Sequence, residues 1–129
     1  MMKVKSAVAM VALLLIFTNA NAQVEKYQSL FIYNFSKYIK WPDDMNSGEF
    51  VIGVLGDSQV YNYLQEMAET KRQTQNMNIV VKKYNSLAEV QKGHILFVSG
   101  SFVTDLSNVT ATSVTKSTLI ITDKPGMAK

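Results

Sequence analysis

The side chains that could do chemistry in this sequence are few. His94 is the single histidine, and the chain contains no cysteine. A Ser-His-Asp triad needs a histidine base with two further partners, and a zinc site needs several histidine or cysteine ligands. A lone imidazole at the head of an apolar segment is more typical of a hydrogen-bonded structural group than of a general base. We therefore predict a structural role for His94, no metal site and no cofactor.

Serine and carboxylate side chains leave a secreted hydrolase as one alternative. Ser99, Ser101 and Asp105 lie close together in the sequence and could take part in such a site. Asp43 and Asp44 are adjacent in a polar loop, where paired carboxylates usually face water. A hydrolase would have to work with one histidine and no cysteine, which disfavours this alternative.

A glycine-containing turn at residues 53–58 (Gly-Val-Leu-Gly-Asp-Ser) links a predicted strand to a predicted helix. Free backbone N–H groups at a helix start can hold an anion, but the segment lacks a full dinucleotide fingerprint and a P-loop lysine. The pattern favours a tight turn in which Gly56 supplies backbone freedom and Ser58 caps the helix. Asp57 and Asp123 both follow predicted parallel strands, at the edge where open α/β sheets bind ligands. A small-ligand receptor using Gly56, Asp57 and Asp123 is therefore an alternative function.

Aromatic residues are densest between residues 33 and 41, at Tyr33, Phe35, Tyr38 and Trp41. Since one face of a helix must cover the sheet, we expect most of these rings in the core. The ring positions nevertheless span more than one helix face, which leaves aromatic surface suited to a protein partner. The candidate partner-binding residues are Tyr38, Trp41 and Pro42.

Hydrophobic spacing predicts the elements that must position these residues. A helix is predicted over residues 23–40, and Trp41-Pro42 ends it. Its repeating positions, which are apolar or aromatic except for Asn34, recur at steps of three and four residues: Tyr27, Leu30, Phe31, Asn34, Phe35 and Tyr38. We expect this face to cover the sheet.

The rest of the chain alternates between strand and helix patterns. The continuous apolar run at 50–55 predicts the central strand, and Val60, Leu64 and Met67 predict one face of a helix that reaches about Thr70. The further predicted elements are a strand near a sheet edge at 78–84, a short helix at 87–90, a buried strand at 94–98, a weak helix at 102–106, loop with frayed helix at 107–117, and a last strand at 119–121. This alternation predicts an α/β fold: an open, mainly parallel, Rossmann-like three-layer sheet with helices on both faces.

The first 22 residues have the form of a signal peptide. Lys3 and Lys5 precede an apolar run of 11 residues, Ala7–Phe17, and Ala20-Asn21-Ala22 ends it with small residues. The run is shorter than the roughly 20 residues that a membrane-spanning helix needs. We expect cleavage after Ala22 and a periplasmic domain over residues 23–129 with no direct membrane insertion. Without the two leader lysines, 11 basic residues face 10 acidic ones, so the net charge falls from +3 to +1 and nucleic acid is an unsuitable partner.

Four segments together resemble the YfiR/HmsC-like family of exported bacterial proteins. They are residues 30–42 (LFIYNFSKYIKWP), 50–56 (FVIGVLG), 94–99 (HILFVS) and 122–128 (TDKPGMA), and the resemblance covers residues 23–129. It implies a small periplasmic α/β domain that is not an enzyme. Family members that are understood hold down a membrane-bound diguanylate cyclase by acting on its periplasmic region, and so restrain cyclic-di-GMP production and biofilm formation. Other relatives sit beside histidine kinases or receptors, and members are found as dimers.

The resemblance therefore implies a non-catalytic regulator that binds and restrains the periplasmic part of a membrane signalling protein, with a homodimer as a further assembly. Two departures from the family pattern are visible. The chain has no cysteine, which excludes the disulfides that some members use. Family members also continue past the Pro-Gly-Met-Ala segment into a glycine turn, a strand pair and a last helix. We accordingly expect a C-terminally truncated domain with the last strands and helix missing, and an open, aggregation-prone sheet edge at residues 118–122.

Overall fold

A mostly parallel sheet lies at the centre of the computed structural model, which describes residues 20–122. Within these residues five strands form one sheet in the order β2-β3-β1-β4-β5, and β2 alone is antiparallel to its neighbour. The strands are β1 (Glu49–Leu55), β2 (Gln73–Thr74), β3 (Met77–Tyr84), β4 (Ile95–Val98) and β5 (Leu119–Thr122). The continuous apolar run of β1 makes it the central strand, because its side chains are covered on both faces of the sheet.

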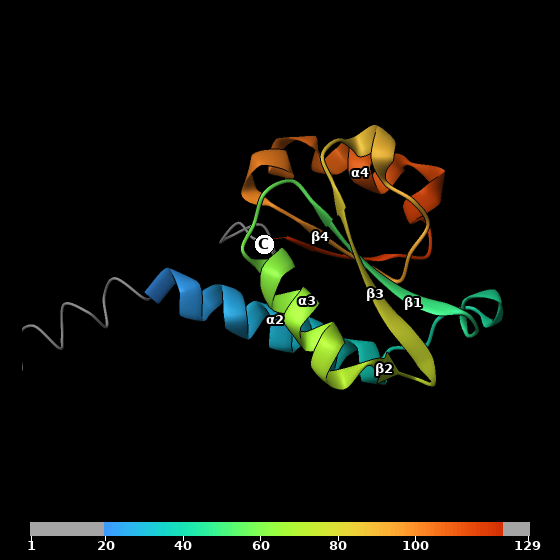
Figure 1. The fold of residues 1–129 in the computed structure, drawn as a ribbon. Helices are drawn as coiled ribbons and strands as arrows, with labels where there is room; N and C mark the ends of the chain where they lie inside the picture. The colour runs from blue at the N-terminus through green and yellow to red at the C-terminus, as the bar shows by residue number, and fades with distance from the viewer. Residues whose placement is uncertain (1–19, 123–129) are drawn as a thin grey trace, which may run out of the picture.

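Helices cover the two faces of the sheet and complete three layers (Figure 1). One face carries α2 (Ala20–Tyr38) and α3 (Val60–Lys71), and the opposite face carries α4 (Leu106–Ala111). Short 3-10 turns occupy the connections: η1 (Asp43–Met45), η2 (Leu87–Glu89), η3 (Gly100–Asp105) and η4 (Ser113–Thr115). The predicted α/β fold with a mainly parallel sheet is confirmed.

Each face of the sheet has its own apolar cluster. The cluster under α2 and α3 contains three side chains of β1, Phe50, Ile52 and Val54, together with Leu64 of α3. Leu55 of β1 belongs to the other cluster, on the α4 side. On the α4 side the Tyr84 ring lies flat against the central strand because the strand has a glycine there. A Cβ at Gly53 would lie 2.6 Å from that ring. Gly53 is thus a packing requirement of the sheet.

Element boundaries differ from the predicted ones in three places. The helix predicted over residues 23–40 begins at Ala20 and ends at Tyr38, so the expected cleavage point after Ala22 falls in its first turn, and residues 1–19 lie outside the described residues. The polar stretch between α3 and β3, for which no element was predicted, forms β2 and a tight hairpin, in which Gln75 and Asn76 have φ values of 49° and 63°. The region expected to be loop with frayed helix contains α4, which buries Val109 against the sheet.

The expectation that the aromatic face of α2 covers the sheet is wrong. Along α2, Ile32 is fully buried, together with Ser29 and Ser36. The predicted core-facing residues of α2 are instead exposed: Tyr27, Leu30, Phe31, Asn34, Phe35 and Tyr38. The helix therefore packs through small polar side chains and turns its aromatic side chains towards the solvent.

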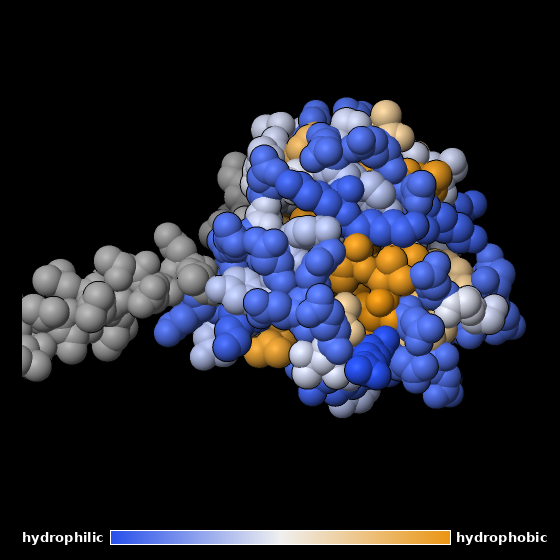
Figure 2. All heavy atoms as spheres, in the orientation of Figure 1, coloured by the Kyte–Doolittle hydropathy of each residue, from blue (hydrophilic) through white to orange (hydrophobic). Residues whose placement is uncertain are grey.

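Hydrophobic residues also reach the surface beside α3, where Figure 2 shows a group of them over β3 and β1. A shallow hollow of about 240 Å³ in this area is lined by Ile79 and Val81 of β3 and by Gln65, Ala68 and Glu69 of α3. None of the helices within residues 20–122 is long and apolar enough to cross a membrane.

Candidate protein-binding surface

The imidazole of His94 is held between two elements. Its Nδ1 accepts a hydrogen bond from the Val51 N–H at 3.1 Å, and its Nε2 lies 2.7 Å from the Met45 carbonyl oxygen. Because a carbonyl oxygen only accepts, Nε2 carries the proton and the ring is the neutral Nε2–H tautomer. The ring also stacks on Phe50 with centroids 4.2 Å apart. Both nitrogens are thus occupied, and His94 has the structural role that the sequence predicted.

Trp41 belongs to the core and not to the surface. Its side chain is 6% exposed, and its ring meets the Phe50 ring edge-on with centroids 5.1 Å apart. The Nε1–H donates to the His94 carbonyl oxygen at 3.2 Å. The prediction that Trp41 presents an exposed ring to a partner is therefore wrong. After α2 the chain turns at Pro42 and η1. This turn places the Trp41 ring against Phe50 of β1.

The two other predicted partner-binding residues lie at the surface on either side of Trp41. Tyr38, the last residue of α2, is 80% exposed, and Pro42 is exposed at the start of η1. Since the tryptophan between them points inwards, the structure separates the predicted trio into a buried anchor and two exposed residues. Tyr38 and Pro42 are available to a partner.

An apolar surface that the sequence analysis assigned to the core runs along α2. Five residues of α2, here called the aromatic stripe, are exposed by 45% to 80%: Val24, Tyr27, Phe31, Phe35 and Tyr38. Leu30 flanks them and is 42% exposed. Single exposed apolar residues are common on protein surfaces, but a contiguous row of large ones marks an interaction site.

A groove continues the aromatic stripe onto the sheet. It has a volume of about 360 Å³ and runs between α2 and β5, lined by Gln28, Phe31, Ile32, Phe35, Ile121 and Thr122. Every residue of β5 is only half-buried, and within the described residues no strand pairs with its outer edge. Stripe and groove together form a surface suited to another protein segment, whose apolar side chains would fill the groove.

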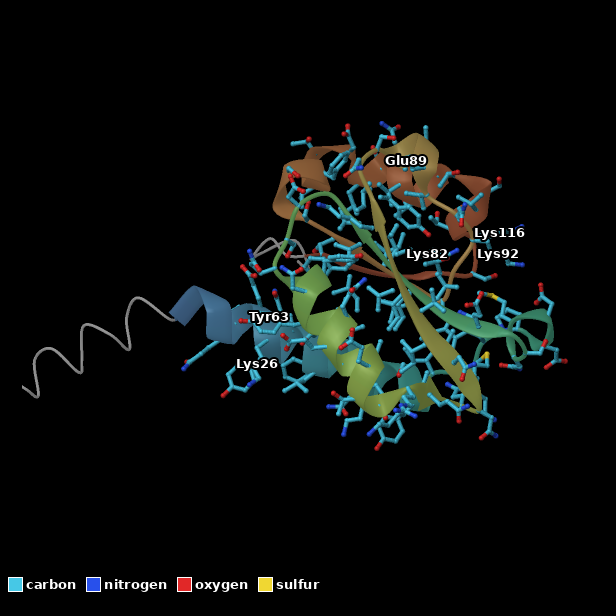
Figure 3. All side chains as sticks on the ribbon, viewed as in Figure 1. Lys26, Tyr63, Lys82, Glu89, Lys92 and Lys116 are labelled. Atoms are coloured by element: carbon cyan, nitrogen blue, oxygen red, sulfur yellow. The ribbon has the colours of Figure 1, made fainter. Side chains whose placement is uncertain are left out.

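Positive charge lies on the side of α2 away from the aromatic stripe. Lys26, Lys37 and Lys40 are all exposed on or just after α2. The Lys37 ammonium lies 4.5 Å from the centroid of the Tyr33 ring, on the side of α2 away from the stripe. Figure 3 shows Lys26 beside Tyr63 of α3, where both line a shallow groove of about 190 Å³ between the two helices. Neither Lys26 nor Lys37 therefore borders the apolar row.

The alternative ligand-binding set is only partly brought together. Gly56 has a φ of +90°, and a Cβ there would lie 2.1 Å from the Ser99 Oγ, so this turn requires glycine and packs against protein atoms. The Asp57 carboxylate lies 2.8 Å from the Lys83 Nζ, and this ammonium lowers the pKa of Asp57 through a hydrogen bond and its charge. Asp123 lies outside the described residues.

A polar hollow of about 390 Å³ opens beside this turn, lined in part by Ser58, Gln59 and Asn62. Ser58 accepts a hydrogen bond from the Val60 N–H at 3.2 Å. The N-cap of α3 is nevertheless Gln59, one residue later than predicted, and its side chain makes no capping hydrogen bond. Gly56 and Ser58 therefore serve the turn, and Asp57 forms an exposed ion pair with Lys83 on the neighbouring strand.

The serines proposed for a hydrolase have no base beside them. The Ser99 Oγ lies 3.0 Å from the Ser101 Oγ, and the Ser99 side chain is buried. His94 cannot serve as the base, because both of its nitrogens are already bonded. Within residues 20–122 no group of three or more histidine, aspartate or glutamate side chains is placed to hold a metal ion.

The model of the YfiR/HmsC-like family matches residues 25–129. The chain belongs to the YfiR/HmsC-like family. The resemblance drawn from the sequence is confirmed, and it places the protein in a family associated with regulation. No curated protein and no solved structure matches the chain.

Proposed function

We propose that this YfiR/HmsC-like protein is a periplasmic regulator that binds the periplasmic part of a membrane signalling protein and restrains its output. A diguanylate cyclase is the first partner class, so that the protein lowers cyclic-di-GMP and biofilm formation. A histidine kinase is the second. In either case regulation comes from occupying a surface of the partner and not from bond chemistry.

The aromatic stripe of α2 is the observation that carries this proposal. A helix that buries Ser29 and Ser36 while it exposes Phe31 and Tyr38 has an apolar face that the other elements of residues 20–122 leave largely uncovered. Desolvating large aromatic side chains is the main source of affinity at protein interfaces. A protein that acts by contact needs such a surface, whereas an enzyme needs a site with positioned catalytic groups.

The chemistry of the described residues also supports regulation by contact. The imidazole of His94 is committed to Val51 and Met45, and the carboxylates of Asp44 and Asp57 pair with lysines at the surface. The Lys92 ammonium lowers the pKa of Asp44 through a hydrogen bond and its charge. These carboxylates are ionised at neutral pH and lie in solvent, where they stabilise loops weakly.

Site-specific photo-crosslinking in the periplasm tests the proposal. A benzophenone amino acid at Tyr38 or Pro42 should yield a covalent product with a membrane protein that carries a cyclase or kinase domain. Thr110 on α4 is the matched control, because it is exposed in the opposite layer of the fold and should give no such product.

A cellular measurement completes this test. Deletion of the gene should raise cyclic-di-GMP, or the phosphorylation output of the kinase, and the intact protein should restore the original level. Unchanged levels of both, together with no membrane protein crosslinked from Tyr38 or Pro42, would show that the proposed function is wrong.

A further inference from the structure

The outer edge of β3 is paired over only part of its length. On one side β1 pairs with β3 from Asn78 to Tyr84, whereas on the other side β2 pairs with Met77 and Asn78 alone. Next to this short pairing the Ile79 N–H donates to the Arg72 carbonyl oxygen at 2.9 Å. Beyond Ile79 no strand of residues 20–122 lies on the outer side of β3. An unpaired strand edge can hydrogen-bond to another extended chain.

The register of the sheet shows which backbone groups of β3 point outwards. Residues of a parallel strand alternate, so that one turns its N–H and C=O towards one neighbour and the next turns them towards the other. The Gly56 N–H donates to the Tyr84 carbonyl oxygen at 2.9 Å, so Tyr84 and Lys82 face β1. Val81 and Lys83 therefore face away from β1, and no backbone hydrogen bond within residues 20–122 reaches them on that side. Their two donors and two acceptors have the spacing that an added strand needs.

A hollow lies on each face of the sheet beside this edge. The hollow of about 240 Å³ on the α3 side is lined in part by Ile79 and Val81, in the area where Figure 2 shows apolar surface. On the opposite face a hollow of about 670 Å³ lies between β3 and η2, and its lining includes Lys82 and Gln91. Because successive side chains of a strand point to opposite faces, the side chains of an added strand would alternate between these two hollows.

Positive charge lies in the middle of the free edge. The Lys82 ammonium donates to the Gln91 Oε1 at 3.0 Å, and within residues 20–122 it forms no ion pair with a carboxylate. Figure 3 shows Lys82 beside β3 and Glu89 above it on η2. The Glu89 carboxylate accepts backbone N–H groups at the start of η2, so it is already used there. A carboxylate on an added strand, directly opposite Lys82, would be a partner of opposite charge.

We propose that the free edge of β3, from Ile79 to Lys83, binds an extended segment of another protein as an additional strand of the sheet. The segment alternates apolar and acidic residues: its apolar side chains enter the α3-side hollow beside Val81, and a carboxylate lies opposite Lys82. Such binding takes its affinity from backbone hydrogen bonds and its specificity from alternate side chains. The proposal does not rest on the proposed function, because the groove that continues the aromatic stripe adjoins β5, at the other edge of the sheet.

Charge argues against the other possible occupants of this edge. The same edge of a second copy would bring Lys82 and Lys83 of both copies together, and like charges on paired strands destabilise a sheet. Residues 1–19 and 123–129 contain four lysines and one aspartate, so these segments of the chain are mainly basic. An acidic segment of another protein is the occupant whose charge complements the edge.

Peptide binding followed by NMR tests the proposal. The probe is a blocked seven-residue peptide in which valine and glutamate alternate, and the control peptide replaces each glutamate with lysine. At millimolar concentration the valine–glutamate peptide should slow the amide exchange of Val81 and Lys83 by about 10-fold, because both N–H groups become hydrogen-bonded. The N–H groups of Val80 and Lys82 face β1 and should change little. The lysine peptide should have no effect.

Methylation of the peptide nitrogens separates strand addition from other kinds of binding. A methyl group on every valine nitrogen removes the donors that face β3 in an antiparallel arrangement, and one on every glutamate nitrogen removes those of a parallel arrangement. One of the two methylated peptides should therefore lose its binding while the other keeps it. Equal binding by the two would overturn the proposal, since contacts made through side chains alone do not depend on alternate backbone donors.

A pair of substitutions at Lys83 tests the edge itself. Lys83→Pro removes the outward N–H and leaves the backbone bonds of Lys82 and Tyr84 to β1 in place, and proline is tolerated at a sheet edge. Lys83→Ala is the matched control, since both variants lose the ion pair with Asp57. Lys83→Pro should bind the valine–glutamate peptide about fivefold more weakly than Lys83→Ala, at a similar melting temperature.

Charge reversal at Lys82 tests the acidic character of the segment. Lys82→Glu should weaken binding of the valine–glutamate peptide by about 10-fold and should bind the lysine peptide instead. Lys26→Glu makes the same change on α2, away from β3, and should leave the binding of both peptides as it is in the unmodified protein.

Three further results would overturn the proposal. The first is amide exchange of Val81 and Lys83 that the valine–glutamate peptide leaves unchanged. The second is slow exchange of these two amide protons before any peptide is added, which shows that another part of the chain or a second copy already covers the edge. The third is a fall in melting temperature for Lys83→Pro far beyond that of Lys83→Ala, which shows that this N–H is already bonded in the protein alone.

Discussion

The helices α2 and α3 cover the same face of the sheet but use opposite kinds of side chain to do so. In α3 the buried residues are Val60, Leu64 and Met67, which is the apolar face that the sequence predicted. Among residues 23–38 of α2, two of the three buried positions are serines. Apolar periodicity therefore shows that one face of a helix is suited to burial. It does not show whether that face packs against the helix's own domain or against another molecule.

The local reason for the difference lies in how closely α2 approaches its neighbours. Serine side chains let the helix axis come near the β2–β3 hairpin, where Thr74 and Gln75 bond to it. Leucines at the same positions would hold the helix further away. The α2 contact is therefore fixed by hydrogen bonds and small volume, and the α3 contact by apolar burial.

The largest effect is expected from the two aromatic residues at the end of α2. Trp41→Ala should reduce the free energy of unfolding by about 3 to 5 kcal/mol, because it empties a core site and removes the hydrogen bond to the His94 carbonyl oxygen. Tyr38→Ala should change it by about 0.5 kcal/mol or less, because Tyr38 is 80% exposed. Urea denaturation of dilute protein measures both values. If both variants lost the same free energy of unfolding, the assignment of Trp41 to the core and of Tyr38 to the surface would be wrong.

A pair of leucines compares the two helices directly. Leu64→Ala in α3 should cost about 2 to 5 kcal/mol, because Leu64 is fully buried. Leu30→Ala in α2 should cost about 1 kcal/mol or less, since Leu30 is 42% exposed and loses only part of its transfer free energy. The same denaturation curves measure this pair, and a larger loss at Leu30 would show that its side chain is covered.

The serine face of α2 gives the third prediction. Ser36→Leu should cost about 1 to 3 kcal/mol although it makes the helix more apolar, because the site has no room and Thr74 loses its hydrogen-bond partner. Ser36→Ala is the control, which keeps the space and removes only the hydroxyl. If Ser36→Leu raised the melting temperature, close packing of α2 against the β2–β3 hairpin would not be what holds the helix in place.

The smallest effect on stability is expected from Tyr84, which lies on the α4 side of the sheet, away from α2 and α3. Burial raises the pKa of the Tyr84 phenol above its ordinary value. The unfolded chain therefore loses this proton at lower pH than the folded protein, so the contribution of Tyr84 is present at neutral pH and is lost as the pH rises above about 10. Tyr84→Phe should flatten the fall in stability between about pH 9 and 11. Melting temperatures across that range measure it, and an unchanged slope would contradict the burial effect.

The sequence was sufficient for β1 and β4, because burial on both faces of the sheet leaves a continuous apolar run. It was sufficient for α3 because the buried residues of that helix recur at steps of four and three. It was insufficient for β2 and α4. The hairpin after α3 turns at Gln75 and Asn76 without glycine. Its one signal in the sequence was Asn76, because asparagine tolerates a positive φ in a turn. In α4 only Val109 is buried, so no apolar period marks the helix.

The surface was harder to predict than the fold. Trp41 and Tyr38 are both aromatic residues near the end of one helix, and nothing local distinguishes an inward from an outward ring. The distinction came from the chain reversal at η1, which depends on the distant His94. The buried serines were a usable signal, since Ser29 and Ser36 lie seven residues apart on the face opposite the stripe.

The bonding of His94 has a consequence for how the protein folds. Its ring joins Val51 to Met45, and its main chain joins Trp41 to Leu119, so one residue connects segments that are dozens of positions apart. Contacts of such high sequence separation form slowly, because the loops between them must close first. No part of this junction can persist while another is open. We expect the amide protons of Val51 and Leu119 to exchange with solvent together, at the rate of global unfolding, which makes the junction a single cooperative unit of the domain.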